Sequence, residues 1–69
     1  MADVRAEMVA SVWKVVVAEG DTVADGDTLV ILESMKMEIP VLAENAGVVS
    51  QLVAEGSTVD EGDLIALVS

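Results

Sequence analysis

An internal repeat limits what this chain can fold into more than any other feature of its sequence. The segment Ala18–Asp27 returns 36 residues later as Ala54–Asp63, and seven of the ten positions are identical. Two copies are too few for a solenoid, which needs at least about three units to bury its faces. A chain of 69 residues holds only one thin core. We therefore expect a single domain, residues 1–69, in which two related halves fold against each other.

The match continues on both sides of the repeated segment, but with other spacings. Val12–Val15 matches Val49–Leu52 at a spacing of 37 residues, whereas Leu29–Leu32 matches Leu64–Leu67 at a spacing of 35. The shorter spacing after the repeated segment predicts one extra residue near Thr28 in the first copy.

The position of the repeat also predicts how the two halves are joined. If they span residues 4–34 and 39–69, the link between them is a hairpin at residues 35–38. A link between two symmetry-related halves crosses close to the axis that relates them, so Lys36 is expected at a protruding tip. The two ends of the chain are then expected to meet at the opposite end of the molecule.

Both halves have the sequence character of β structure. Valine is the commonest residue, and the apolar segments are short and are cut by Gly-Asp pairs, which favour turns. Short strands are expected around Val23 and Val59. The longer expected strands are Val4–Val9, Val12–Val17, Thr28–Glu33, Met37–Leu42, Val48–Val53 and Asp63–Val68.

One segment near the start of the chain is also compatible with a helix. Its apolar residues lie at helical spacing, at Val4, Met8, Val12 and Val15. The matching part of the second half contains Pro40 and Gly47, which disfavour the interior of a helix. Since two related halves should share one structure, strands are the preferred interpretation.

The repeat assigns the faces of these strands. In both halves an apolar, variable, polar, apolar pattern turns Val12 and Val15 inward and leaves Trp13 and Lys14 facing outward. The Trp13 indole is expected to be at least partly exposed or at the edge of the core, and a core tryptophan is the alternative. Ser50 and Gln51 occupy the same outward positions in the second half. Strict alternation fails at this point, which indicates a bulge. The other residues expected in the core are Val17, Val23, Leu29, Ile31, Val49, Leu52, Val53, Val59, Leu64 and Leu67.

Composition excludes several classes of function. The chain has three basic and thirteen acidic residues, and a net charge of −10 repels nucleic acid and anionic lipid and favours a monomer. Without Cys or His, neither thiolate nor imidazole chemistry is available. No apolar run approaches the roughly 18 residues that a membrane span needs, and the first residues lack the basic and apolar regions of a secretory signal. We expect a cytoplasmic protein without a metal site.

The hairpin linking the halves breaks the local rules for such turns. It contains no Gly or Asn, and it places Met35 and Met37 on either side of Lys36, one of only two lysines in the chain. An exposed lysine by itself is ordinarily a solvated charge. Two methionines at a protruding tip, however, gain little packing, and such a departure is typical of a functional site.

The segment Glu33–Glu38 resembles the Met-Lys-Met attachment motif of the biotinyl (biotin carboxyl carrier) domains of biotin-dependent carboxylases. The turns with the pattern Gly-Asp-x-Val-x-x-Gly-Asp are similar to those of the wider biotinyl and lipoyl family. This resemblance implies an all-β flattened barrel or sandwich of two four-stranded antiparallel sheets with a pseudo-twofold axis. It also implies that Lys36 carries covalent biotin, and that Met35 and Met37 distinguish biotinyl from lipoyl domains.

The same resemblance implies a carrier rather than an enzyme, with no catalytic residue of its own. A biotin protein ligase would transfer biotin from biotinyl adenylate to Lys36, and the arm would carry carboxylate between a biotin carboxylase and a carboxyltransferase. Lys14, which lies outside any motif, is expected to stay unmodified. Two alternatives remain at this point: a lipoyl-type acyl carrier, and an interaction module whose lysine is never modified.

Overall fold

The computed structural model describes residues 2–69 as eight β-strands in two four-stranded antiparallel sheets, which confirms the expected fold class. No helix is present in this part of the chain, and thus none that could cross a membrane. The first sheet has the order β1 (Ala2–Arg5), β8 (Leu64–Val68), β6 (Gly47–Leu52) and β3 (Thr22–Val23). The second sheet has the order β5 (Met37–Leu42), β4 (Thr28–Ser34), β2 (Ala10–Val15) and β7 (Thr58–Val59).

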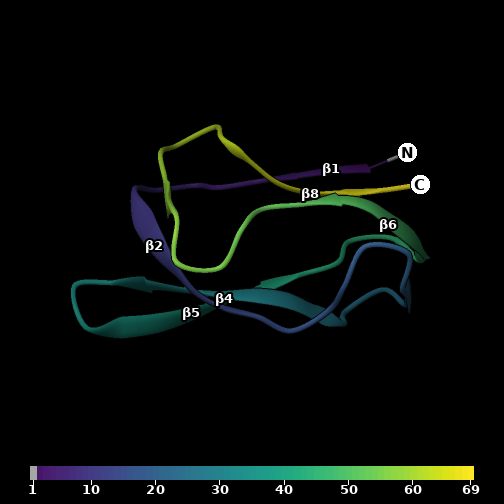
Figure 1. The fold of residues 1–69 in the computed structure, drawn as a ribbon, viewed down its shortest axis with the longest axis horizontal. Helices are drawn as coiled ribbons and strands as arrows, with labels where there is room; N and C mark the ends of the chain where they lie inside the picture. Colours follow the sequence, from purple (N-terminus) through teal and green to yellow (C-terminus); the bar gives the residue numbers. More distant parts are fainter. Residues whose placement is uncertain (1) are drawn as a thin grey trace.

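Each sheet contains strands from both halves of the repeat. Replacing every strand of the order β1-β8-β6-β3 by its counterpart in the other half gives β5-β4-β2-β7, which is the second sheet. Figure 1 shows the β4–β5 hairpin at one end of the molecule, and the start of β1 beside the C-terminus at the other. Ala2 pairs with Val68 there; Met1, whose position was also predicted, lies outside the described residues.

Four tight turns with glycine at the third position shape the two halves. Gly20, Gly26, Gly56 and Gly62 have φ angles of 94°, 92°, 87° and 89°, which a type II turn requires and which side chains other than glycine rarely adopt. In three of the turns the next residue is an aspartate, whose carboxylate accepts the N–H of the first turn residue, as in Ala18 N–H to Asp21 Oδ2 at 2.9 Å. The fourth turn has Ser57 instead, and its hydroxyl donates to the Ala54 carbonyl at 2.6 Å.

The core between the sheets is built from small aliphatic side chains. The largest of those with almost no exposure are Leu29, Ile65, Val12, Val30 and Val49. Register shifts between Val12 and Lys14 and between Val49 and Gln51 confirm the bulge that the sequence predicts. The bulge in each half turns two successive side chains outward after the buried valine.

The prediction that Ile31 and Leu67 belong to the core is wrong. The buried residues of β4 are Leu29, Val30 and Leu32, because a register shift between Thr28 and Val30 turns two successive side chains inward before alternation resumes. In β8, Ile65, Ala66 and Val68 are buried in the same way, and Leu64 is only half-buried.

The extra residue of the first half is also not where the sequence comparison placed it. The hydrogen bond from Val16 N–H to the Leu29 carbonyl corresponds to that from Val53 N–H to the Ile65 carbonyl. The spacing is therefore 37 residues up to Val16 and 36 from Ala18 onward, and the burial patterns of β4 and β8 agree at a spacing of 36. The extra residue lies at Val17 rather than near Thr28.

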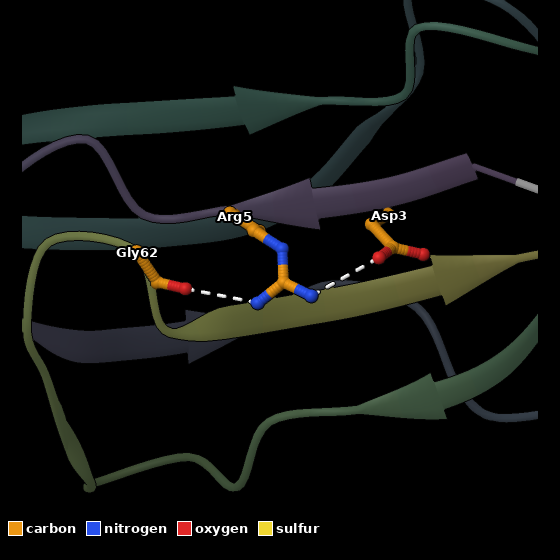
Figure 2. A network of polar contacts seen from close by, with 3 residues as sticks. All are labelled: Asp3, Arg5 and Gly62. Carbon is orange, nitrogen blue, oxygen red and sulfur yellow. Dashed lines mark hydrogen bonds and ion pairs between the residues drawn. The ribbon is translucent and has the colours of Figure 1, made fainter.

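Strand β1 ends earlier than predicted, at Arg5 instead of Val9. Beyond it, the Ala6 N–H donates to the Asp63 carbonyl and the Gly62 N–H donates to the Ala6 carbonyl, each at 2.8 Å. Figure 2 shows that the Arg5 guanidinium joins strand β1 to the turn between β7 and β8, with hydrogen bonds of 2.9 Å to the Gly62 carbonyl and 3.1 Å to Asp3. The chain is thus held by the β7–β8 turn instead of extending as a strand to Val9.

Glycine is needed for lack of space at some positions of this fold and for a positive φ angle at others, and substitution by alanine or asparagine distinguishes the two cases. A Cβ at Gly47 would lie 2.5 Å from the Ser69 carbonyl oxygen and 2.8 Å from Val68 Cγ1, whereas at Gly20 it would meet nothing within 4 Å. Gly47→Ala is expected to lower the free energy of unfolding by about 1–3 kcal/mol, as overpacking does. Gly47→Asn should cost at least as much, whereas Gly20→Asn should cost less than Gly20→Ala, because asparagine tolerates positive φ. Urea unfolding followed by circular dichroism measures all four variants, and equal costs of Ala and Asn at Gly20 would contradict this reading.

Candidate functional site

Met35 and Lys36 form the two-residue turn of the β4–β5 hairpin. The ladder below them runs without interruption from Ile31 opposite Pro40 to Ser34 opposite Met37. Met35 has φ of 51° and Lys36 has φ of 65°, the left-handed combination of a type I′ turn, which normally uses Asn-Gly or similar pairs. Holding two residues with side chains in this conformation costs about 1 kcal/mol each.

The side chains of the tip project into solvent. Met35 is 90% exposed and Met37 is 59% exposed, and Lys36 is exposed as well. Among residues 2–69 the ion pair of Arg5 with Asp3 is the only one, so the Lys36 amine has no acidic partner there. The tip therefore presents a primary amine between two apolar side chains, away from the rest of the sheet.

The stem of the hairpin is tied to the neighbouring loop. The Ser34 hydroxyl donates to the Val9 carbonyl at 3.3 Å, and Ser11 of β2 lies opposite Glu33. Glu33 and Glu38 stand directly opposite each other in the ladder. Since like charges at opposed positions weaken strand pairing, neither glutamate serves the stability of the stem.

The structure separates the two lysines of the chain. Lys14 lies within β2, opposite Ile31 of β4, and its ammonium is 5.3 Å from the centroid of the Trp13 ring. It is held in a sheet and not in a turn. Of the residues singled out in the sequence, Met35, Lys36 and Met37 are therefore brought together at the tip, and Lys14 is not.

No pattern in the sequence indicates that Val9 lies beside the hairpin. Its contact with Ser34 joins residues 25 positions apart, and Val9 is 60% exposed. An exposed apolar residue is a feature that the sequence could have singled out, but only the strand pairing of the structure shows that it lies beside the hairpin.

A groove of about 500 Å³ also opens between the edge strands β1 and β5, over Leu32, Ile39 and Val41. No group of side chains suited to holding a metal ion occurs within residues 2–69.

Comparisons with known proteins agree with this geometry. A family model described as biotin-requiring enzyme, covering biotin and lipoyl attachment domains, matches residues 1–68. A biotinylated protein TB7.3 homolog of Mycobacterium leprae is 71% identical over 49 residues, which are 71% of this chain and 69% of that protein. The biotin-dependent acyl-coenzyme A carboxylase alpha3 subunit of the same organism is 53% identical over 49 residues, which are 71% of this chain but 8% of that subunit.

A solved structure shows the same fold within a larger enzyme. The urea carboxylase of Kluyveromyces lactis superimposes with a TM-score of 0.91 and 36% identity, over 99% of this chain and 6% of that one. Domains similar to this chain thus form small parts of carboxylases. From the family match over nearly the whole chain and the shared fold, this chain belongs to the biotin/lipoyl attachment family.

Proposed function

We propose that the protein is a biotin carboxyl carrier whose Lys36 is joined to biotin by a biotin protein ligase. The observation that carries the proposal is the protruding turn, in which Lys36 stands exposed between Met35 and Met37. The family match and the biotinylated relative support it. The partners of the modified protein would be a biotin carboxylase and a carboxyltransferase. The similarity to a subunit of a biotin-dependent carboxylase supports partners of this kind.

The residues of the tip fit a covalently attached biotin. Attachment needs an amine that a second protein can reach, and the left-handed turn holds the backbone of Lys36 clear of the sheet. In the ligase, the Lys36 Nζ attacks the carbonyl carbon of biotinyl adenylate; the new C–N bond forms, the bond to the phosphate oxygen breaks, and AMP and a proton leave. Attached biotin supplies the ureido nitrogen that carries carboxylate from one active site to the other.

Met35 and Met37 offer the ligase an apolar contact surface on either side of the amine. Methionine side chains are flexible and adapt to a complementary surface, and burying one contributes about 1.5–3 kcal/mol. Recognition by two methionines also separates biotin from lipoate attachment, since the fold of the two kinds of domain is shared. We further propose that the carrier works in the cytoplasm and as a monomer, and its net charge of −10 favours the monomeric state.

Modification of one lysine and not the other tests the proposal. After expression with a biotin protein ligase and biotin, the intact mass of the wild type is expected to rise by one biotinyl group. Lys36→Arg should remain unmodified and Lys14→Arg should be modified like the wild type, because only Lys36 lies in the turn. An unshifted mass of the wild type, or loss of modification in Lys14→Arg, would contradict the proposal. A parallel incubation with lipoate and lipoate ligase distinguishes the lipoyl carrier.

The conformation of the turn predicts opposed effects on stability and modification. Met35→Asn is expected to raise the free energy of unfolding by about 0.5–1 kcal/mol, because asparagine accepts the left-handed backbone more readily. The same change should slow biotinylation about tenfold, the effect of losing roughly 1.4 kcal/mol of ligase contact.

Met37→Thr is the matched control for this pair of effects. Met37 lies in β5 and is exposed, but it is not among the residues with positive φ. Threonine there should slow biotinylation without the gain in stability. Urea unfolding measures the stability of both variants, and the initial rate of biotin incorporation measures their modification. If Met35→Asn is no more stable than the wild type, the turn is not strained at this residue.

A further inference from the structure

The symmetric scaffold carries very different residues on its two outer faces. On the second sheet, Trp13 and Leu42 are 43% and 44% exposed. Their counterparts in the other half, 37 positions away, are Ser50 and Arg5. The same backbone positions thus accept polar residues, and the fold does not require an exposed apolar surface at either of them.

The polar face of the first sheet satisfies its own side chains. Arg5 pairs with Asp3 at 3.1 Å (Figure 2), and the Ser50 hydroxyl donates to the Leu67 carbonyl at 3.2 Å. Two of the corresponding residues of the second sheet have no polar side-chain group, since Pro40 stands in place of Asp3 and Leu42 in place of Arg5. At these positions the sheet that carries the Lys36 hairpin is therefore the more apolar of the two, although Val48 of the first sheet is 43% exposed where the second sheet has Ser11.

The strand register gathers these residues into one patch. Lys14 of β2, Ile31 of β4 and Pro40 of β5 lie side by side in the ladder. Trp13 is the extra residue of the adjoining bulge, and the Lys14 ammonium is 5.3 Å from its ring centroid. We call this surface the outer patch, consisting of Trp13, Lys14, Ile31, Pro40 and Leu42.

The outer patch lies within reach of an arm attached to Lys36. From the turn to the row of Ile31 the chain runs four to five residues along β4, about 15 Å at roughly 3.3 Å per residue, and β2 is one strand, about 4.8 Å, to the side. A lysine side chain extended by the pentanoyl chain of biotin has roughly eleven bonds from Cα to the ring, which span about 14 Å when each advances about 1.3 Å. The bicyclic ring and the indole bridge the remaining distance.

We propose that the bicyclic ring of biotin on Lys36 folds back onto the Trp13 indole, with its ureido oxygen accepting a hydrogen bond from the Lys14 ammonium. This inference rests on the proposed function. The chemistry of the patch matches the ligand, because the ring offers an aliphatic face to the indole and one strong acceptor to the cation. A hydrated ring in free solution has neither contact.

A short tether makes even a weak contact effective. A group held near its site by a short flexible linker experiences an effective concentration of millimolar order. A contact with a dissociation constant of about that size is then occupied roughly half of the time. The ring rests on the patch between encounters, and it leaves readily when a partner active site offers tighter binding.

The single aromatic residue of the chain makes the proposal directly testable. With one Trp and no Phe or Tyr, any upfield ring-current shift of the biotin ring protons in the modified protein arises from Trp13. Relative to free biotinyl-lysine, the ring protons of the biotinylated wild type are expected to move upfield in proton NMR. The Trp13 fluorescence should also shift to shorter wavelength when unmodified and biotinylated protein are compared, because the ring displaces water from the indole.

Matched variants take their residues from the other half of the molecule. Trp13→Ser installs the residue found at position 50, and Lys14→Gln that found at position 51. Biotinylated Trp13→Ser should lose the upfield shift entirely, and Lys14→Gln should show a smaller one. Trp13→Leu, which keeps an apolar side chain, guards against loss of folding in the serine variant and should also lose the shift.

Each of the other possible results of these experiments overturns one specific part of the proposal. If mass spectrometry shows full modification but the biotin ring protons match those of free biotinyl-lysine, the ring does not rest on Trp13, although the proposed function stands. If in addition Trp13→Leu slows carboxylation of the carrier by a biotin carboxylase, the outer patch is a protein docking surface instead. An unchanged shift in Lys14→Gln removes the hydrogen bond to Lys14, and absence of modification overturns the proposed function itself.

Discussion

The fold depends on hydrogen bonds that each half donates to the other through its glycine turns. The Gly20 N–H donates to the Val49 carbonyl at 2.7 Å, and the Gly56 N–H donates to the Val12 carbonyl at 2.9 Å. Val12 and Val49 are almost completely buried, so their peptide groups need partners within the protein. Because each half supplies these partners to the other, the halves fold together, and the hairpin joining them is left at the end of the molecule.

The sandwich leaves four strand edges open, and they are protected in three different ways. Strands β3 and β7 have only two residues each, too few to pair with another chain. Strand β5 carries Pro40, which lacks an N–H, and β1 carries the charged pair Asp3 and Arg5. Charges, proline and short length are the usual means of preventing edge-to-edge association. The β4–β5 hairpin is thereby kept free of strand pairing with other chains.

Sequence reasoning predicted those features that the repeat encodes and missed those that depend on local register. The bulge after Val12 and the outward position of Trp13 follow from comparing the halves, and the two four-stranded sheets follow from the family resemblance. The run Leu29–Leu32 shows no alternation of polar and apolar residues, so its faces were undetermined and Ile31 was placed in the core wrongly. The attachment motif singled out Lys36, but its left-handed backbone was invisible, since lysine and methionine have no preference for that conformation.

Within residues 2–69 the chain uses glycine for positive φ everywhere except at the tip. Gly20, Gly26, Gly56 and Gly62 take this conformation at the turns that hold the halves together, and only Met35 and Lys36 take it with side chains. The two together cost about 2 kcal/mol, a substantial part of the 5–15 kcal/mol typical of a small domain. Asn-Gly would form the same turn without that cost, but it would present neither an amine nor an apolar side chain. The strain is therefore confined to the one turn where the chemistry of the side chains, and not the path of the backbone, determines which residues are present.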